Sequence, residues 1–128
     1  PPRPRPRALS RSRALQVGQS LQDARDGAVR ADKERQFARE GRSGLRPLLK
    51  EGRGNSRAYV ARPGGVLVRL PLVVADAVLA GDIERGDADY AGHRAAQKAA
   101  VAELRDSGGL PPSVTPEMLR PFLELRDP

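Results

Sequence analysis

The chain has 128 residues and a formal net charge of +7, from 23 basic and 16 acidic residues. This length allows a single domain with a modest core, and the absence of cysteine excludes disulfides, thiolate metal sites and a cysteine nucleophile. Arg69, Pro71 and Asp76 interrupt the most apolar run, residues 66–80, so no membrane span is predicted.

The charge is unevenly distributed. Residues 1–64 contain 14 Arg and 2 Lys against 6 acids, whereas residues 65–128 contain 6 Arg and 1 Lys against 10 acids. Arginine binds phosphate or carboxylate through two parallel hydrogen bonds, so this composition suits a nucleic acid or an acidic protein. A GC-rich genome would also favour arginine over lysine, but it would not place the charge in one half. We therefore expect a basic arm or face attached to a near-neutral folded part.

The fold class predicted is mainly α with one short β-hairpin, a small α+β protein with an extended basic N-terminal arm. Only 3% of the residues are aromatic, so a core of Ala, Leu and Val buries little apolar area per residue. Apolar burial contributes roughly 25 cal/mol per Å², which has to exceed the entropy lost on ordering the chain. We therefore expect the chain to be non-compact without partners.

Three segments are predicted before the hairpin. Residues 1–13 form a Pro/Arg-rich extended arm, because each proline of "PPRPRPR" fixes its own φ and favours extended geometry before it. Residues 14–41 form a basic helix ending near Gly41. Its apolar residues recur at spacings of three and four: Val17, Leu21, Ala24, Ala28 and Ala31. Residues 42–57 form a Gly/Arg-rich linker.

Residues 58–128 are predicted to form a small module of a hairpin and helices. The turn signal "RPGG" separates Tyr59 and Val60 from the apolar residues 66–70. Two strands alone are marginal in water, so they need a helix on one face or an added strand from a partner. A short helix is predicted to end near Gly81 or Gly86, a second to begin at Asp87, and a third to begin after Thr115. The second helix would have a small-residue packing face of Ala91, Ala95, Ala99 and Ala102.

No catalytic set is evident in the sequence. His93 is the sole histidine, so a zinc site is not favoured, and the acidic residues of "GDIERGDADY" do not follow the EF-hand spacing. Helix capping accounts for Asp87 and Asp89 without a metal. The sequence offers no general base to accompany any of the serines, so none of them is predicted to be a nucleophile. We therefore expect a protein that is not an enzyme and has no cofactor, metal or small-molecule substrate.

The favoured function is that of a structural accessory subunit of a large ribonucleoprotein. In general character the chain resembles the small basic accessory proteins of organelle ribosomes, which implies an intracellular location, mitochondrial or in another organelle. The arm and linker would neutralise RNA phosphates, and the C-terminal half would contact neighbouring protein subunits. The residues predicted to contact phosphate are Arg3, Arg5, Arg7, Arg11, Arg13, Arg42, Arg46, Arg53 and Arg57.

The alternative is an accessory structural subunit of a protein-only assembly, such as a respiratory complex or a cytoskeletal filament. The arginine arm would then dock on an acidic protein surface, or its prolines would occupy an aromatic-lined groove. Phosphate and carboxylate accept the same pair of hydrogen bonds from a guanidinium, so both hypotheses stay open. A DNA-binding regulator is less favoured, since no helix-turn-helix, zinc-finger or basic-zipper pattern is present.

Overall fold

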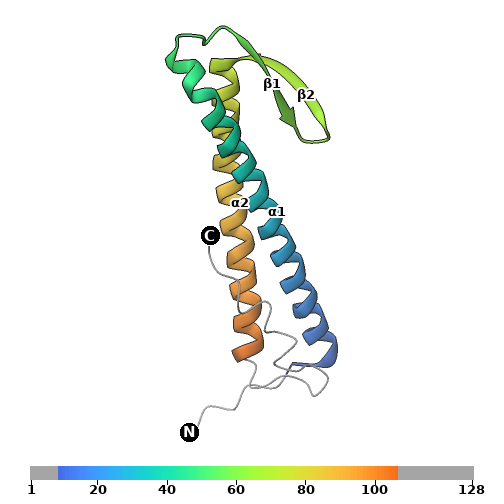
Figure 1. Ribbon diagram of the computed structural model, residues 1–128. Helices are drawn as coiled ribbons and strands as arrows, with labels where there is room; N and C mark the ends of the chain where they lie inside the picture. Colours follow the sequence, from blue (N-terminus) through green and yellow to red (C-terminus); the bar gives the residue numbers. More distant parts are fainter. Residues whose placement is uncertain (1–8, 107–128) are drawn as a thin grey trace. The chain divides into compact units, whose positions relative to one another are not determined.

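A computed structural model describes residues 9–106, and four elements follow one another in this part of the chain (Figure 1). They are the helix α1 (Arg11–Lys50), the strands β1 (Arg57–Arg62) and β2 (Val66–Pro71), and the helix α2 (Leu72–Asp106). The described chain is therefore mainly helical with one antiparallel hairpin, which confirms that part of the predicted fold class. Residues 1–8 of the predicted arm and the predicted helix after Thr115 lie outside the described residues.

The helix α1 begins at Arg11, immediately after a capping serine. Ser10 accepts hydrogen bonds from the backbone N–H of Arg13 through its Oγ at 3.1 Å and from that of Ala14 through its carbonyl at 2.9 Å. The first contact satisfies a donor that a helix N-terminus otherwise leaves without a partner, and the second is the first backbone hydrogen bond of the helix. The extended arm was predicted to reach residue 13, and this is wrong for residues 11–13, which form the first helical turn.

The helix α1 continues past Gly41 to Lys50, so the first part of the predicted linker is helical. Gly52 ends the helix with a φ of 77°, a conformation that favours glycine. Its N–H donates to the carbonyl of Leu49, and the N–H of Arg53 donates to that of Leu48, both at 3.1 Å. This pair of bonds is a Schellman cap. Gly41 does not end the helix, since its φ is not positive. A Cβ at this position would lie 3.2 Å from Leu79 Cδ1, so the glycine packs closely against Leu79.

Replacing Gly52 with alanine is expected to lower the free energy of unfolding by about 1 kcal/mol, since alanine is strained at a positive φ. Gly44 is the matched control, because it lies inside α1 and a Cβ there would meet no atom within 4 Å. Gly44→Ala should stabilise by up to about 1 kcal/mol through helix propensity. Thermal unfolding followed by circular dichroism checks both variants, and equal effects of the two would contradict this account.

The described residues belong to two compact units. The described part of unit 1 comprises residues 9–29 and 90–106, and its core joins α1 to α2 through Val17, Leu21, Ala100 and Leu104. Arg13 pairs with Glu103, whereas Gly27 lies under the ring of His93, so the two helices run antiparallel in this unit. The predicted apolar face of α1 is confirmed, since Val17, Leu21, Ala24, Ala28 and Ala31 are all buried.

Unit 2 comprises Arg30–Asp89 and contains the hairpin. Its core is formed by Ala38 of α1, Val60 of β1, and Ala75 and Leu79 of α2. Partly buried hydrophobic residues pack around it, namely Leu45, Leu70, Val78 and Ile83. The sequence predicted that the hairpin needs a helix on one face, and Val60 meets that need by packing against both helices.

The helix α2 runs without a break from Leu72 to Asp106, so the predicted division near Gly81 or Gly86 is wrong. Gly86 is buried against α1, where an added Cβ would lie 2.7 Å from the Cβ of Arg35. The glycine therefore permits close helix packing rather than ending a helix. The predicted small-residue face is also wrong, because each of its alanines is exposed: Ala91, Ala95, Ala99 and Ala102.

Candidate docking surface on the β-hairpin

The hairpin of unit 2 has two chemically different faces. In the antiparallel register, Val60 lies opposite Val68, Ala58 opposite Leu70 and Arg62 opposite Val66, and Val60 and Leu70 of this inner face pack on the helices. Side chains alternate across a sheet, so the residues between them face outward. This outer face consists of Arg57, Tyr59, Ala61, Leu67, Arg69 and Pro71.

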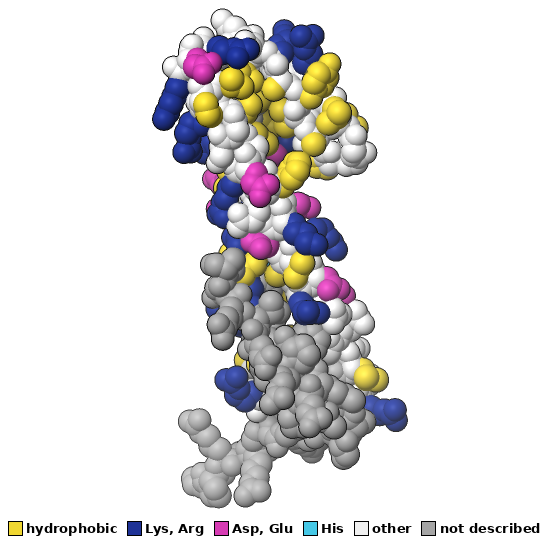
Figure 2. All heavy atoms as spheres, in the orientation of Figure 1, with side chains coloured by type: hydrophobic (Ala, Val, Ile, Leu, Met, Phe, Trp, Pro, Cys, Tyr) yellow, Lys and Arg dark blue, Asp and Glu magenta, His cyan; other side chains and the backbone are white. Residues whose placement is uncertain are grey.

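The outer face exposes large apolar side chains to solvent. Tyr59 is 70% exposed and Leu67 is 64% exposed. Tyr59 lies opposite Arg69, so it is the diagonal neighbour of Leu67, and the two side chains belong to one patch. Figure 2 shows hydrophobic side chains at the surface of the hairpin with Lys and Arg side chains beside them. None of the six residues of the outer face is acidic, so the patch combines apolar and basic side chains.

Both strands of this sheet are edge strands, since β1 and β2 pair only with each other within the described residues. An edge strand presents backbone N–H and C=O groups that a further strand can bind. The connecting turn contains Gly64 and Gly65, with φ values of 84° and 78°, which a side chain would strain. The hairpin therefore offers an apolar face together with open edges.

The base of the hairpin is fixed to α2 by hydrogen bonds. The N–H of Leu72 donates to the carbonyl of Ser56 at 2.8 Å, and that of Val73 donates to the carbonyl of Gly54 at 3.2 Å. Near the turn, Arg62 Nη1 donates to Asp82 of α2 at 2.5 Å. The outer face is therefore held in place by contacts on its opposite side, which limits the entropy lost when a partner binds.

The predicted phosphate-binding arginines fall into three groups. Arg3, Arg5 and Arg7 lie outside the described residues. Two others are in ion pairs, Arg13 with Glu103 in unit 1 and Arg42 with Asp76 in unit 2. The remaining ones are exposed and have no ion pair within residues 9–106: Arg11, Arg46, Arg53 and Arg57.

The sequence did not identify Arg35 as a structural residue. Arg35 is buried, and its guanidinium pairs with Asp32 at 2.8 Å and with Asp87 at 3.3 Å. Burial lowers the pKa of Arg35, but hydrogen bonds to the two carboxylates outweigh it, so the pKa is raised above its ordinary value and the charge is retained. The sequence spacing could have indicated that residue 35 is buried, because it continues the alternating three-and-four spacing of Ala28 and Ala31. Asp87 was predicted as a helix cap and instead forms this ion pair.

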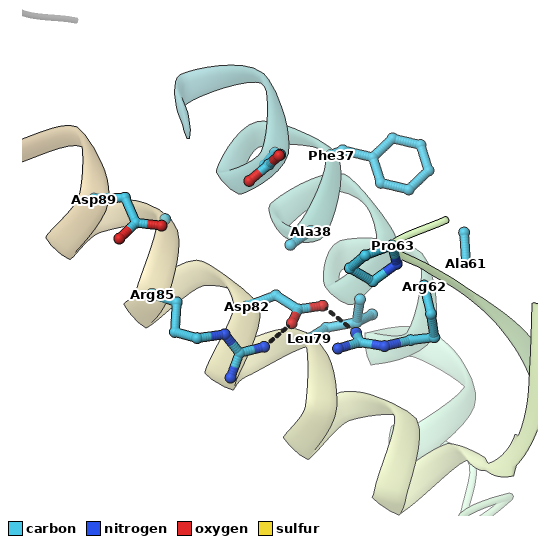
Figure 3. A pocket seen from close by; sticks show the side chains of 11 residues that line it. Phe37, Ala38, Ala61, Arg62, Pro63, Leu79, Asp82, Arg85 and Asp89 are labelled. Carbon is cyan, nitrogen blue, oxygen red and sulfur yellow. Dashed lines mark hydrogen bonds and ion pairs between the residues drawn. The ribbon is translucent and has the colours of Figure 1, made fainter. Parts of the chain in front are cut away.

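A cavity of about 310 Å³ lies in unit 2, lined by residues of α1, the hairpin and α2 (Figure 3). Its apolar lining includes Phe37, Pro63 and Leu79. Asp82 accepts hydrogen bonds from both Arg62 and Arg85 at one side of the cavity. Two further acids, Glu34 and Asp89, complete the charged part of the lining.

Within residues 9–106, no group of three or more His, Cys, Asp or Glu side chains is placed to hold a metal ion. Neither described helix has the length and hydropathy to cross a membrane. No protein-family model matches the chain, and neither the curated proteins nor the solved structures gave a match.

Proposed function

We propose that the chain is a non-catalytic structural subunit of a multi-subunit assembly, attached to a protein neighbour through the outer face of its hairpin. The observation that carries this proposal is the solvent exposure of Tyr59 and Leu67 on the face of the sheet opposite to the packed Val60 and Leu70. Exposed aromatic and arginine side chains on one patch are typical of protein interfaces.

The charge of the patch indicates the kind of neighbour. Arg69 lies directly opposite Tyr59, Arg57 lies at the start of β1, and no carboxylate lies on the outer face. A neighbour that presents apolar and acidic side chains would complement this surface. The open edges of β1 and β2 would allow the neighbour to add a strand, so that backbone hydrogen bonds contribute affinity. The experiment that tests the proposal is sedimentation of an outer-face variant in a native lysate, described in the Discussion.

The ribonucleoprotein hypothesis is the second candidate, and a separate observation favours it. Arg46, Arg53 and Arg57 follow one another from the last turns of α1 to the start of β1, and all three are exposed. Lys50 adds a further exposed cation to this stretch, against one acid, Glu51. These guanidiniums have no carboxylate partner among the described residues, so they are available to phosphate.

Replacing Arg46, Arg53 and Arg57 together with alanine is expected to weaken RNA binding and its salt dependence. Each phosphate contact with single-stranded RNA contributes about 0.7 to the slope of log K against log salt, so losing three contacts should reduce the slope by about 2. Fluorescence anisotropy with a labelled RNA oligonucleotide at several salt concentrations measures this slope. The corresponding triple lysine variant keeps the charge and should keep the slope. An unchanged slope in the alanine variant would exclude these residues as phosphate contacts.

A further inference from the structure

The cavity of unit 2 combines an apolar wall with an excess of acid. Phe37 lines it and is 65% exposed, which is unusual exposure for a phenylalanine beside apolar neighbours such as Pro63 and Leu79. Figure 3 shows Arg62 and Arg85 reaching the same carboxylate, Asp82, from opposite sides. Both cations of the lining are therefore already paired.

The other two acids of the cavity have no such partner. Glu34 and Asp89 are exposed, and no hydrogen bond or ion pair joins either of them to another residue of the range 9–106. The lining thus contains three carboxylates and two guanidiniums. An occupant that is apolar and positively charged would complement it, whereas an anion would be repelled.

The chain itself contains a segment of this chemistry. Residues 1–7, "PPRPRPR", contain prolines and arginines and no acid. The other stretch outside the described residues, 107–128, also contains prolines but has three acids against two arginines. Charge complementarity therefore selects the N-terminal segment. We propose that the cavity binds residues 1–7 of a second copy of the chain.

The cavity would bind this segment in the way that aromatic-lined grooves bind proline-rich ligands. Alternating prolines favour a polyproline helix, which loses little conformational entropy on binding and projects rings and charged side chains at regular intervals. A proline ring of the second copy packs against Phe37 and Pro63, and an adjacent arginine pairs with Glu34 or Asp89. The cavity is at the small end of the range for binding pockets, about 300–1,000 Å³, so it accommodates one Pro-Arg step rather than the whole segment.

Self-association of the full chain tests the proposal. Sedimentation equilibrium at low salt should show a concentration-dependent dimer of the wild type. The segment variant R3A/R5A/R7A and the cavity variant E34Q/D89N should each associate at least tenfold more weakly. An equimolar mixture of the two variants should recover association, because the mixture pairs an intact cavity with an intact segment. The control E40Q/E84Q removes the same charge at exposed positions outside the cavity lining and should associate like the wild type.

Several results would overturn the proposal. They are a wild type that stays monomeric throughout, a variant that associates as well as the wild type, and a mixture that fails to pair. A control variant as weak as E34Q/D89N would also overturn it, since bulk charge would then explain the effect. The proposal is separate from attachment through the outer face of the hairpin. E34Q/D89N should still sediment with the larger assembly, and a variant of Tyr59 and Leu67 should still dimerise.

Discussion

Replacing Gly86 with alanine is expected to destabilise unit 2 by about 1–3 kcal/mol, the usual cost of adding a methyl group to a packed interior. The new Cβ would lie 2.7 Å from the Cβ and 3.3 Å from the Cα of Arg35, and 3.5 Å from the carbonyl oxygen of Ala31. Two of these atoms belong to the backbone of α1, so rotation of a side chain cannot relieve the contact. The helices have to separate instead.

Separation of the helices would also disturb the ion pairs beside Gly86. Arg35 and Arg39 of α1 both reach Asp87, at 3.3 and 3.1 Å. Moving α1 away would leave the buried guanidinium of Arg35 less well paired, which adds to the steric cost. The whole effect should appear as a thermal midpoint several degrees lower.

Gly92 provides the matched control in the same helix. A Cβ at Gly92 would meet no atom within 4 Å, so Gly92→Ala should stabilise by up to about 1 kcal/mol through helix propensity. Urea unfolding followed by circular dichroism at 222 nm measures both variants. A stabilising Gly86→Ala would contradict the close approach of α1 and α2 in unit 2.

Replacing Tyr59 and Leu67 together with serine is expected to abolish incorporation into the assembly while leaving the isolated chain as stable as the wild type. Both side chains are largely exposed on the outer face, so their removal creates no cavity in the core. Hot-spot residues of an interface, among which tyrosine is enriched, cost about 2 kcal/mol or more when truncated. With a smaller contribution from Leu67, the double variant should weaken attachment by at least 100-fold, which is the fold-change equivalent of about 2.8 kcal/mol.

Leu15 supplies the matched control for the outer-face variant. It is 63% exposed, close to the value for Leu67, but it lies in unit 1. Leu15→Ser removes similar exposed apolar area without touching the hairpin, so incorporation should be unchanged. If Leu15→Ser were as damaging as the outer-face variant, general loss of surface hydrophobicity would explain both results.

The elements that follow local rules could be predicted from the sequence. The hairpin was found because "RPGG" is a strong turn signal between two short apolar runs, and its register places Val60 inward and Tyr59 outward by simple alternation. The apolar face of α1 was found because Val17, Leu21 and Ala24 recur at the helical period. Such signals depend on residues close together in the chain.

The positions that depend on packing between distant segments could not be predicted. Gly41 and Gly86 look like helix ends, yet their neighbours across the helix pair are Leu79 and Arg35. The sequence does not distinguish a glycine that permits close helix packing from a glycine that ends a helix. The structure does, because only the second kind has a positive φ, as Gly52 has. The ion pairs of Arg13 with Glu103 and of Arg42 with Asp76 also could not be predicted, because each joins residues far apart in the chain.

The exposed face of the hairpin shows where sequence and structure complement each other. The sequence indicated that two strands need additional contacts, and the structure supplies helices on one face only. Tyr59 and Leu67 are the residues left without cover on the other face. The candidate site therefore could be located only after the inner face was known.

Sedimentation of the tagged full chain in a native lysate, with and without ribonuclease, tests the central claim most directly. The account predicts that the wild type migrates with a heavy particle and that the Tyr59 and Leu67 variant migrates as a free small species. A heavy particle that survives ribonuclease would favour a protein assembly, and one that ribonuclease dissolves would favour the ribonucleoprotein hypothesis. A wild type that sediments as a free small species, or an outer-face variant that still enters the particle, would contradict attachment through the hairpin.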